Sequence, residues 1–282
     1  MENKSRKKVG VAFGGGAVLG AAHIGVLKAF HEAGVPIDMT SGTSAGAIIA
    51  ACVAFGVPLE KIEGIARDIG WFSISALPES RLGFASNKGL GKLLINIIGD
   101  RTFAESHVPL MVLATDVETG NKKVFTEGNV ALAVRASAAI PIFFSPVSID
   151  NRLYADGGLV ENVPVSPLID AGAEIIIAID LAKQGKTFSP KVIPDMIDLC
   201  VYLFAQHRDQ ALRNSVAILI EPQTDTFDSR NFSNVDALIE AGYKAAQASI
   251  PLIQEKIGSL NPPPEKREES FWQRLLRVLF KS

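Results

Sequence analysis

Short runs of consecutive apolar residues alternate with longer segments of helical pattern along most of the chain. Four runs have the length and composition of strands buried on both faces: residues 9–13, 110–114, 174–179 and 216–220. Apolar positions recur at helical spacing over residues 23–33, 44–55, 59–69, 88–98 and 130–138. Strands that alternate with helices favour a mostly parallel sheet covered on both faces. The pattern therefore predicts an α/β protein with a three-layer α/β/α fold.

The segment 71–100 departs from this alternation, because its pattern is weaker and it is rich in Ser, Gly, Leu and Phe. Two interpretations are open at this point. The segment forms a mobile cover over a site, or it is an ordinary peripheral helix with loops.

The pattern beyond residue 190 changes twice. Long helices are predicted over residues 193–214 and 235–257, and the proline- and charge-rich residues 261–270 then predict a linker. Residues 271–281 regain a helical period, with an aromatic and aliphatic face opposite a basic one. This is typical of a membrane-interface anchor, although docking on the domain or on a second subunit is the alternative. We therefore divide the chain into a main domain (1–260), a linker (261–270) and an amphipathic tail helix (271–282).

Composition narrows the class of protein. A length of 282 residues, 48% hydrophobic and 21% charged, suits one large globular α/β domain. The net charge of −2 indicates no nucleic-acid binding.

The two cysteines bear on the cellular compartment. Cys52 and Cys200 lie in apolar, helix-like runs, so we expect both to be small core residues of a protein in a reducing compartment. The apolar run 9–27 contains six glycines, which is unlike a signal peptide, so we expect a cytoplasmic protein with at most peripheral membrane contact. A homo-oligomer is compatible with this composition.

A serine stands between two glycines in Gly42-Thr43-Ser44-Ala45-Gly46, after a short strand-like segment and before the predicted helix 44–55. A strand that turns sharply into a helix strains its corner residue, and flanking glycines relieve the crowding. The serine hydroxyl then projects from the sheet edge, at the positive end of the helix dipole. This predicts a nucleophile at Ser44, with Gly42 and Gly46 in support. Taken alone, the motif is better explained as a turn of small residues.

A glycine-rich loop follows the first strand: Gly14, Gly15, Gly16 and Ala17 precede Gly20. Consecutive glycines let backbone N–H groups converge on an anion, which is either a phosphate or a developing oxyanion. The glycine spacing also resembles a nucleotide-binding loop, with Asp38 near the end of the second strand as a ribose ligand. A nucleotide-binding oxidoreductase is therefore one alternative.

A third motif is Asp156-Gly157-Gly158, which follows a strand and precedes Asn162-Val163-Pro164. Taken alone, it is explained by a simple Asx turn.

The three motifs together resemble the patatin-like phospholipase family, most closely its bacterial members related to neuropathy target esterase. Residues 136–141 and 114–116 match further blocks of that family, and the resemblance covers roughly residues 8–182 in the family's order.

The resemblance implies a serine acyl hydrolase that acts on phospholipid or lysophospholipid esters without a cofactor or metal. Ser44 is then the nucleophile and Asp156 its base, supported by Gly157 and Gly158. Gly14, Gly15, Gly16 and Ala17 form the oxyanion loop, with the N–H groups of the last three holding the charge. A carboxylate with a pKa of about 3.9 is a weak base, so this mechanism requires a desolvated Asp156.

The chain departs from the family at one position, because Leu19 stands where the family usually carries Arg or Lys. This keeps a second alternative open, a lipid-binding or regulatory protein with little turnover. A Ser–His–Asp triad is a further rival, and His207 is the only late histidine that could serve it. We expect a structural role for His23 and surface positions for His31 and His107. No histidine has a partner at metal-ligand spacing.

Overall fold

The computed structural model describes residues 6–181, 196, 199 and 216–258. The linker 261–270, the tail helix 271–282, His207 and Cys200 lie outside these residues, as does nearly all of the predicted helix 193–214. The predicted membrane contact of residues 271–281 therefore stays a prediction.

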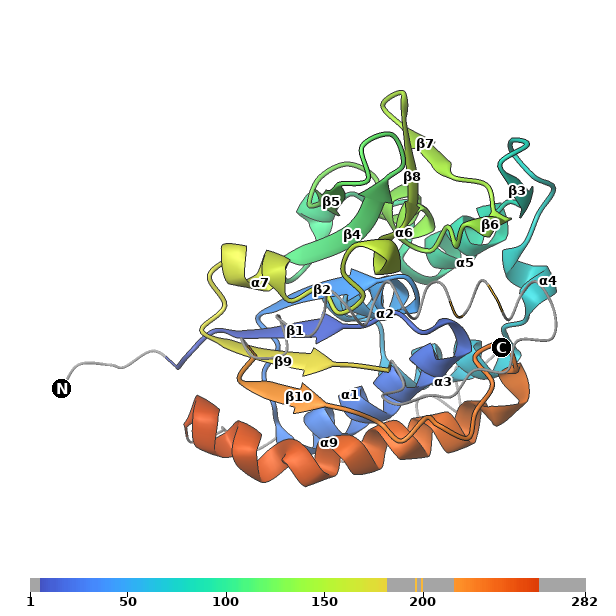
Figure 1. Cartoon of the computed structure of the whole chain (residues 1–282). Helices are drawn as coiled ribbons and strands as arrows, with labels where there is room; N and C mark the ends of the chain where they lie inside the picture. Colours follow the sequence, from blue (N-terminus) through green and yellow to red (C-terminus); the bar gives the residue numbers. More distant parts are fainter. Residues whose placement is uncertain (1–5, 182–195, 197–198, 200–215, 259–282) are drawn as a thin grey trace, which may run out of the picture.

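One sheet forms the centre of the molecule (Figure 1). Its strands lie in the order β10 (Ile218–Ile220), β9 (Ile175–Ile179), β1 (Val9–Phe13), β2 (Met39–Thr43), β4 (Leu110–Asp116), β8 (Arg152–Asp156) and β7 (Val147–Ile149), with β5 (Lys122–Phe125) also paired to β4. The neighbours from β10 to β4 are parallel, whereas β5 and β8 run antiparallel to β4. The four predicted strands are all present.

Helices flank this sheet and confirm the predicted fold class. They are α1 (Ala22–Ala33), α2 (Ala45–Ala54), α3 (Leu59–Asp68), α4 (Trp71–Ile74), α5 (Lys88–Ile98), α6 (Val130–Ser137), α7 (Ser166–Asp170) and α9 (Val235–Ile257), together with short 3-10 turns that include η1 (Ala17–Ala21), η2 (Phe103–Glu105), η3 (Gly157–Leu159) and η4 (Phe232–Asn234). Helices α1 and α9 lie side by side below the sheet, and α7 lies on the opposite side (Figure 1). No helix of the described chain has the length and apolar character needed to cross a bilayer.

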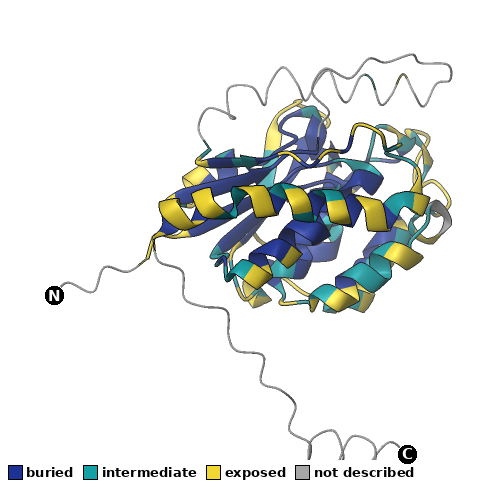
Figure 2. Ribbon diagram, turned by 90° about the horizontal axis from the view of Figure 1, so that it is seen from below, coloured by how far each residue is buried: buried dark blue, intermediate teal, exposed yellow. Residues whose placement is uncertain are grey.

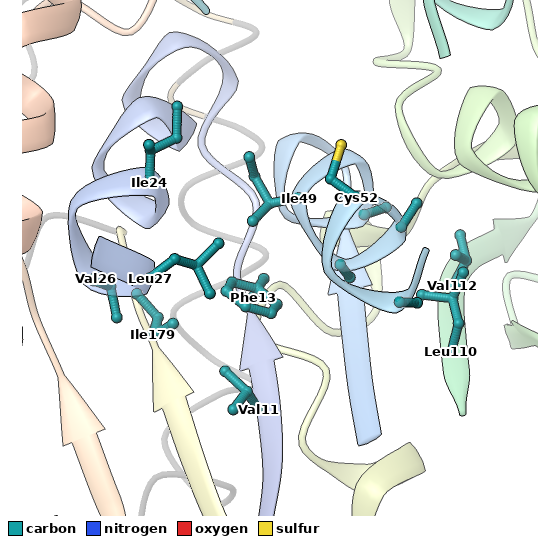
Figure 3. Close-up of a cluster of buried hydrophobic side chains, with 14 of the residues drawn as sticks. Val11, Phe13, Ile24, Val26, Leu27, Ile49, Cys52, Leu110, Val112 and Ile179 are labelled. Carbon is teal, nitrogen blue, oxygen red and sulfur yellow. The ribbon is translucent and has the colours of Figure 1, made fainter. Parts of the chain in front are cut away.

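Strands β1, β9 and β10 are apolar throughout because both faces of the sheet are covered there. Val11 and Phe13 point to the main core, where side chains of α1 and α2 such as Leu27 and Ile49 surround them (Figure 3). The alternate residue Ala12 points to a second cluster. That cluster also contains Met111, Ile176, Val165 and Leu168. Figure 2 shows the same layering, with buried strands inside the exposed outer faces of the helices.

The segment 71–100 forms α4, β3 (Gly83–Ala85) and α5. Strand β3 pairs in parallel with β6 (Ile142–Phe144) as a separate two-stranded ribbon. Helix α5 contacts α6 and buries Leu94 completely. The peripheral-helix interpretation is therefore correct for α5. Residues of α4 and α5 also line the cavity described below, and the mobility of the segment stays a prediction.

Candidate active site

Ser44 occupies the sharp corner between β2 and α2. Its backbone angles are φ 54° and ψ −122°, a strained region for a residue with a side chain. Neighbouring groups hold this conformation. The Ser44 N–H donates to the Ser137 hydroxyl at 2.9 Å, and that hydroxyl donates to the Leu113 carbonyl at 2.6 Å. The predicted corner is present. Ser137 was not predicted as a functional residue, although it lies in the matched block 136–141.

Glycines allow the backbone segments at this corner to cross at very short range. A Cβ on Gly46 would lie 2.0 Å from the carbonyl oxygen of Phe13, at the end of β1. A Cβ on Gly42 would lie 2.5 Å from the Cα of Ala47. Both contacts involve backbone atoms that cannot move aside, so these two positions exclude any larger residue. The predicted supporting role of Gly42 and Gly46 follows from this crossing.

Strand register brings Asp156 to Ser44. Thr43 of β2 is level with Leu113 of β4, and the next residue of β4, Ala114, pairs with Asp156 of β8. Ser44 and Asp156 therefore flank β4 at the same height. Asp156 ends its strand, and its Oδ1 accepts the Gly158 N–H at 2.8 Å. This is the Asx turn that the motif alone predicted, and it aims the carboxyl at the serine.

The environment of Asp156 suits a base. The side chain is buried, and this desolvation raises its pKa to about 6, against the opposing effects of hydrogen bonds from the Ser44 side chain and the Gly158 N–H. At neutral pH the carboxyl is still ionised. It binds a proton more readily than an exposed aspartate, as the dyad requires.

The glycine loop lies against Ser44, because a Cβ built on Gly15 would lie 3.2 Å from the Ser44 Cβ. Two of its N–H groups are already bonded within the fold: Gly14 donates to Ile179 at 3.0 Å and Gly15 to Asn162 at 3.1 Å. The predicted use of the Gly15 N–H group as an anion donor therefore does not fit this structure, and the Gly14 N–H group is likewise occupied. Within the described residues, the N–H groups of Gly16 and Ala17 have no acceptor.

The His23 side chain contacts the glycine loop at Gly14. Its ring is fully buried, its Nε2 lies 2.8 Å from the Gly14 carbonyl oxygen, and burial lowers its pKa to about 4. The ring is therefore neutral, and Nε2 must carry the proton because a carbonyl only accepts. This confirms a structural role for His23. His31 and His107 are exposed, as expected, and the described residues contain no cluster of metal-ligating side chains.

Asp38 does not occupy the position that a ribose ligand requires. It precedes β2, where its carboxylate accepts Arg6 Nη2 at 2.7 Å and the Val9 N–H at 2.8 Å. The glycine loop follows the carboxyl end of β1, and the two strands are parallel. Asp38 is therefore at the opposite edge of the sheet, and its predicted role was wrong.

Ser44 is among the residues that line an apolar cavity of about 150 Å³. Aliphatic side chains of α1, α2, α3 and α5 form most of the lining, with Ile140 and Phe144 at β6. Cys52 lines the cavity, and burial raises the pKa of its thiol to about 12, so it is not a reactive thiolate. Such a cavity fits a long hydrocarbon chain rather than a polar nucleotide.

Comparison with known proteins agrees with this geometry. The family model described as patatin-like phospholipase matches residues 11–169. The chain is 28% identical to the neuropathy target esterase sws of Drosophila melanogaster over 83% of its own length and 19% of that protein. It is 24% identical to the lysophospholipase nte1 of Emericella nidulans over 96% of its length and 20% of that protein. The chain therefore spans about a fifth of these two relatives.

A protein of the NTE family from Mycobacterium tuberculosis is 32% identical over 71% of this chain and 58% of its own length. Among solved structures, VipD from Legionella pneumophila has a similar fold, with a TM-score of 0.51 over 89% of this chain and 67% of VipD. The sequences of these two are 14% identical, so this likeness concerns the fold alone.

Proposed function

Because the chain belongs to the patatin-like phospholipase family, we propose that it is a serine acyl hydrolase acting on phospholipid or lysophospholipid esters. One observation carries the proposal: the strained Ser44 lines an aliphatic cavity and its side chain is hydrogen-bonded to the buried Asp156. Two relatives, named as an esterase and a lysophospholipase, support the substrate class.

In this mechanism Asp156 accepts the Ser44 proton as the hydroxyl oxygen attacks the ester carbonyl carbon. The tetrahedral intermediate collapses, the acyl chain stays on Ser44, and Asp156 returns the proton to the departing alcohol. Water then attacks the acyl-enzyme, with Asp156 as the base once more, and releases the fatty acid. The aliphatic cavity holds the acyl chain throughout.

The oxyanion is assigned to the N–H groups of Gly16 and Ala17, which have no acceptor in the described part of the chain. Gly14 and Gly15 then serve as the frame of the loop. Leu19, where the family usually carries a basic residue, is buried in the main core and leaves these two N–H groups in place. Leu19 in place of a basic residue therefore changes no group to which this mechanism assigns a role.

Covalent labelling with a fluorophosphonate probe tests the proposal. Wild-type protein should label and hydrolyse a short-chain ester, Ser44→Ala should do neither, and Asp156→Ala should label far more slowly. Labelling that persists in Ser44→Ala would exclude Ser44 as the nucleophile. A large loss of activity in His207→Ala would favour a triad over the dyad. Labelling without turnover of any lipid ester would favour the low-turnover, lipid-binding alternative.

A further inference from the structure

Four large apolar side chains are exposed around the β3–β6 ribbon. Leu77 is 88% exposed, Phe84 75%, Leu82 58% and Ile142 49%. Ile142 also has a φ of 73°, which is unusual for a β-branched residue. The ribbon brings them together, since Gly83, between Leu82 and Phe84, pairs with Ile142. We call these four residues the ribbon patch. A contiguous apolar surface of this kind on a soluble domain marks an interaction site.

The ribbon patch continues into the cavity that contains Ser44. Ile142 stands between Ile140 and Phe144, and both of these line the cavity. Leu77 follows the lining residue Ile74 by three positions, and Phe84 precedes the lining residue Asn87 by three. The same ribbon thus presents apolar side chains to solvent on one side and to the cavity on the other.

Basic side chains border the patch. Arg81 is exposed between Leu77 and Leu82, and Lys88 and Lys92 are exposed on the following helix. Glu79 is the acidic neighbour, and it is paired with Lys88 at 3.1 Å and with Arg135 at 2.5 Å. Exposed apolar side chains with a cationic rim match the interface of a phospholipid layer, where acyl chains lie beneath phosphate groups.

We propose that the ribbon patch docks the protein on a phospholipid surface and aligns the cavity mouth with the acyl chains. This inference rests on the proposed function for the identity of the substrate, while docking itself is measurable without turnover. It is independent of the predicted anchor at residues 271–281. The occupant is a lipid surface, and a second copy of the chain is the competing outcome.

Leu82→Asp/Phe84→Asp tests the patch, with Ile169→Asp, which is exposed on α7, as the matched control. Turnover of lysophosphatidylcholine in vesicles of phosphatidylcholine and phosphatidylglycerol should fall about tenfold or more, because two apolar groups no longer insert. Turnover of a soluble short-chain ester should stay unchanged, as should both activities of Ile169→Asp. Equal vesicle turnover by wild type and the double variant would overturn the proposal.

A second measurement needs no catalysis. In a Ser44→Ala background, Phe84→Trp should show an added, blue-shifted emission with these vesicles, whereas Ile169→Trp should not. A shift at position 84, together with no esterase activity in the wild-type protein that retains Ser44, would retain docking while rejecting the proposed function. No shift at position 84 would overturn docking even in an active enzyme. If the double Asp variant instead converts a dimer to a monomer in light scattering, the patch is a subunit interface and the proposal fails.

Discussion

Ser44 and Asp156 are ordinary side chains placed in unusual surroundings. The serine hydroxyl gains its position from a strained backbone, and the carboxyl gains its basicity from burial. The strain at Ser44 is held by the hydroxyl of Ser137 and by a crossing that only glycine permits. The chemistry proposed for this pair therefore depends on neighbours that take no part in the reaction.

The pH dependence of turnover follows from the raised pKa of Asp156, which is about 6. Only the ionised carboxyl accepts a proton, so kcat/KM for a soluble ester should fall about tenfold per pH unit below that value and level off above it. The measurement is a profile between pH 4.5 and 8, with His31→Ala as the control that leaves it unchanged. A profile that stays flat to pH 4.5 would contradict Asp156 as the base.

The raised pKa of Asp156 also means that this residue lowers the free energy of unfolding once its carboxyl is ionised. A buried carboxyl with a raised pKa favours folding while it is protonated, and this contribution is lost as the pH rises from about 4 to about 6. Asp156→Asn keeps an acceptor for the Gly158 N–H but carries no charge. It should therefore raise the free energy of unfolding by up to about 3 kcal/mol at pH 8.

Urea unfolding of wild type and Asp156→Asn at pH 8 and pH 4 measures this difference. The gain should be present at pH 8 and absent at pH 4, where the wild-type carboxyl is protonated. A variant less stable than wild type at pH 8 would contradict the burial argument. Turnover should be lost at both pH values, since the amide accepts no proton.

At the scale of elements, the corner between β2 and α2 depends on the close approach of β1, β2 and α2. Gly46→Ala would place a methyl group 2.0 Å from the Phe13 carbonyl oxygen, so the start of α2 must move away from β1. We expect a loss of about 3 kcal/mol or more in the free energy of unfolding, with loss of turnover.

Gly64→Ala is the matched control for that prediction. Gly64 lies inside α3, and nothing is within 4 Å of a Cβ built there. Alanine in an open helix position should stabilise by about 0.5–1 kcal/mol and leave turnover intact. Thermal unfolding of the two variants, followed by circular dichroism, compares them directly. Equal stabilities would show that the crossing at Gly46 is not as tight as described.

At the scale of the whole molecule, the cavity is assembled from segments far apart in the chain. Ala66 of α3 lines it opposite residues of α2 and α5. Ala66→Phe should shorten the usable space and so reduce hydrolysis of long-chain esters, while turnover of a butyrate ester stays close to wild type. Rates on a series of p-nitrophenyl esters measure the change. An equal decrease for all chain lengths would point to general misfolding rather than to a smaller cavity.

Local pattern was enough to predict much of this protein. Continuous apolar runs fixed the strand positions because both faces of the sheet are buried, and the glycine motifs located the turns at Ser44 and Asp156 because sharp turns need small residues. The roles assigned to these two residues came from the family resemblance. Asp38 was placed at the wrong edge of the sheet, since β2 begins at Met39 and Asp38 therefore precedes this strand.

Tertiary structure decided which groups meet. The register of β2, β4 and β8 sets Ser44 beside Asp156, although 112 positions separate them in the chain. Hydrogen bonds from distant segments occupy the N–H groups of Gly14 and Gly15, which sequence alone presented as free donors. Desolvation of Asp156 and the aliphatic cavity likewise arise from packing between segments distant in sequence. Sequence thus determined the residue types and their turns. Burial and proximity required the folded chain, and they set the pKa of Asp156 and the N–H groups that remain as donors to an anion.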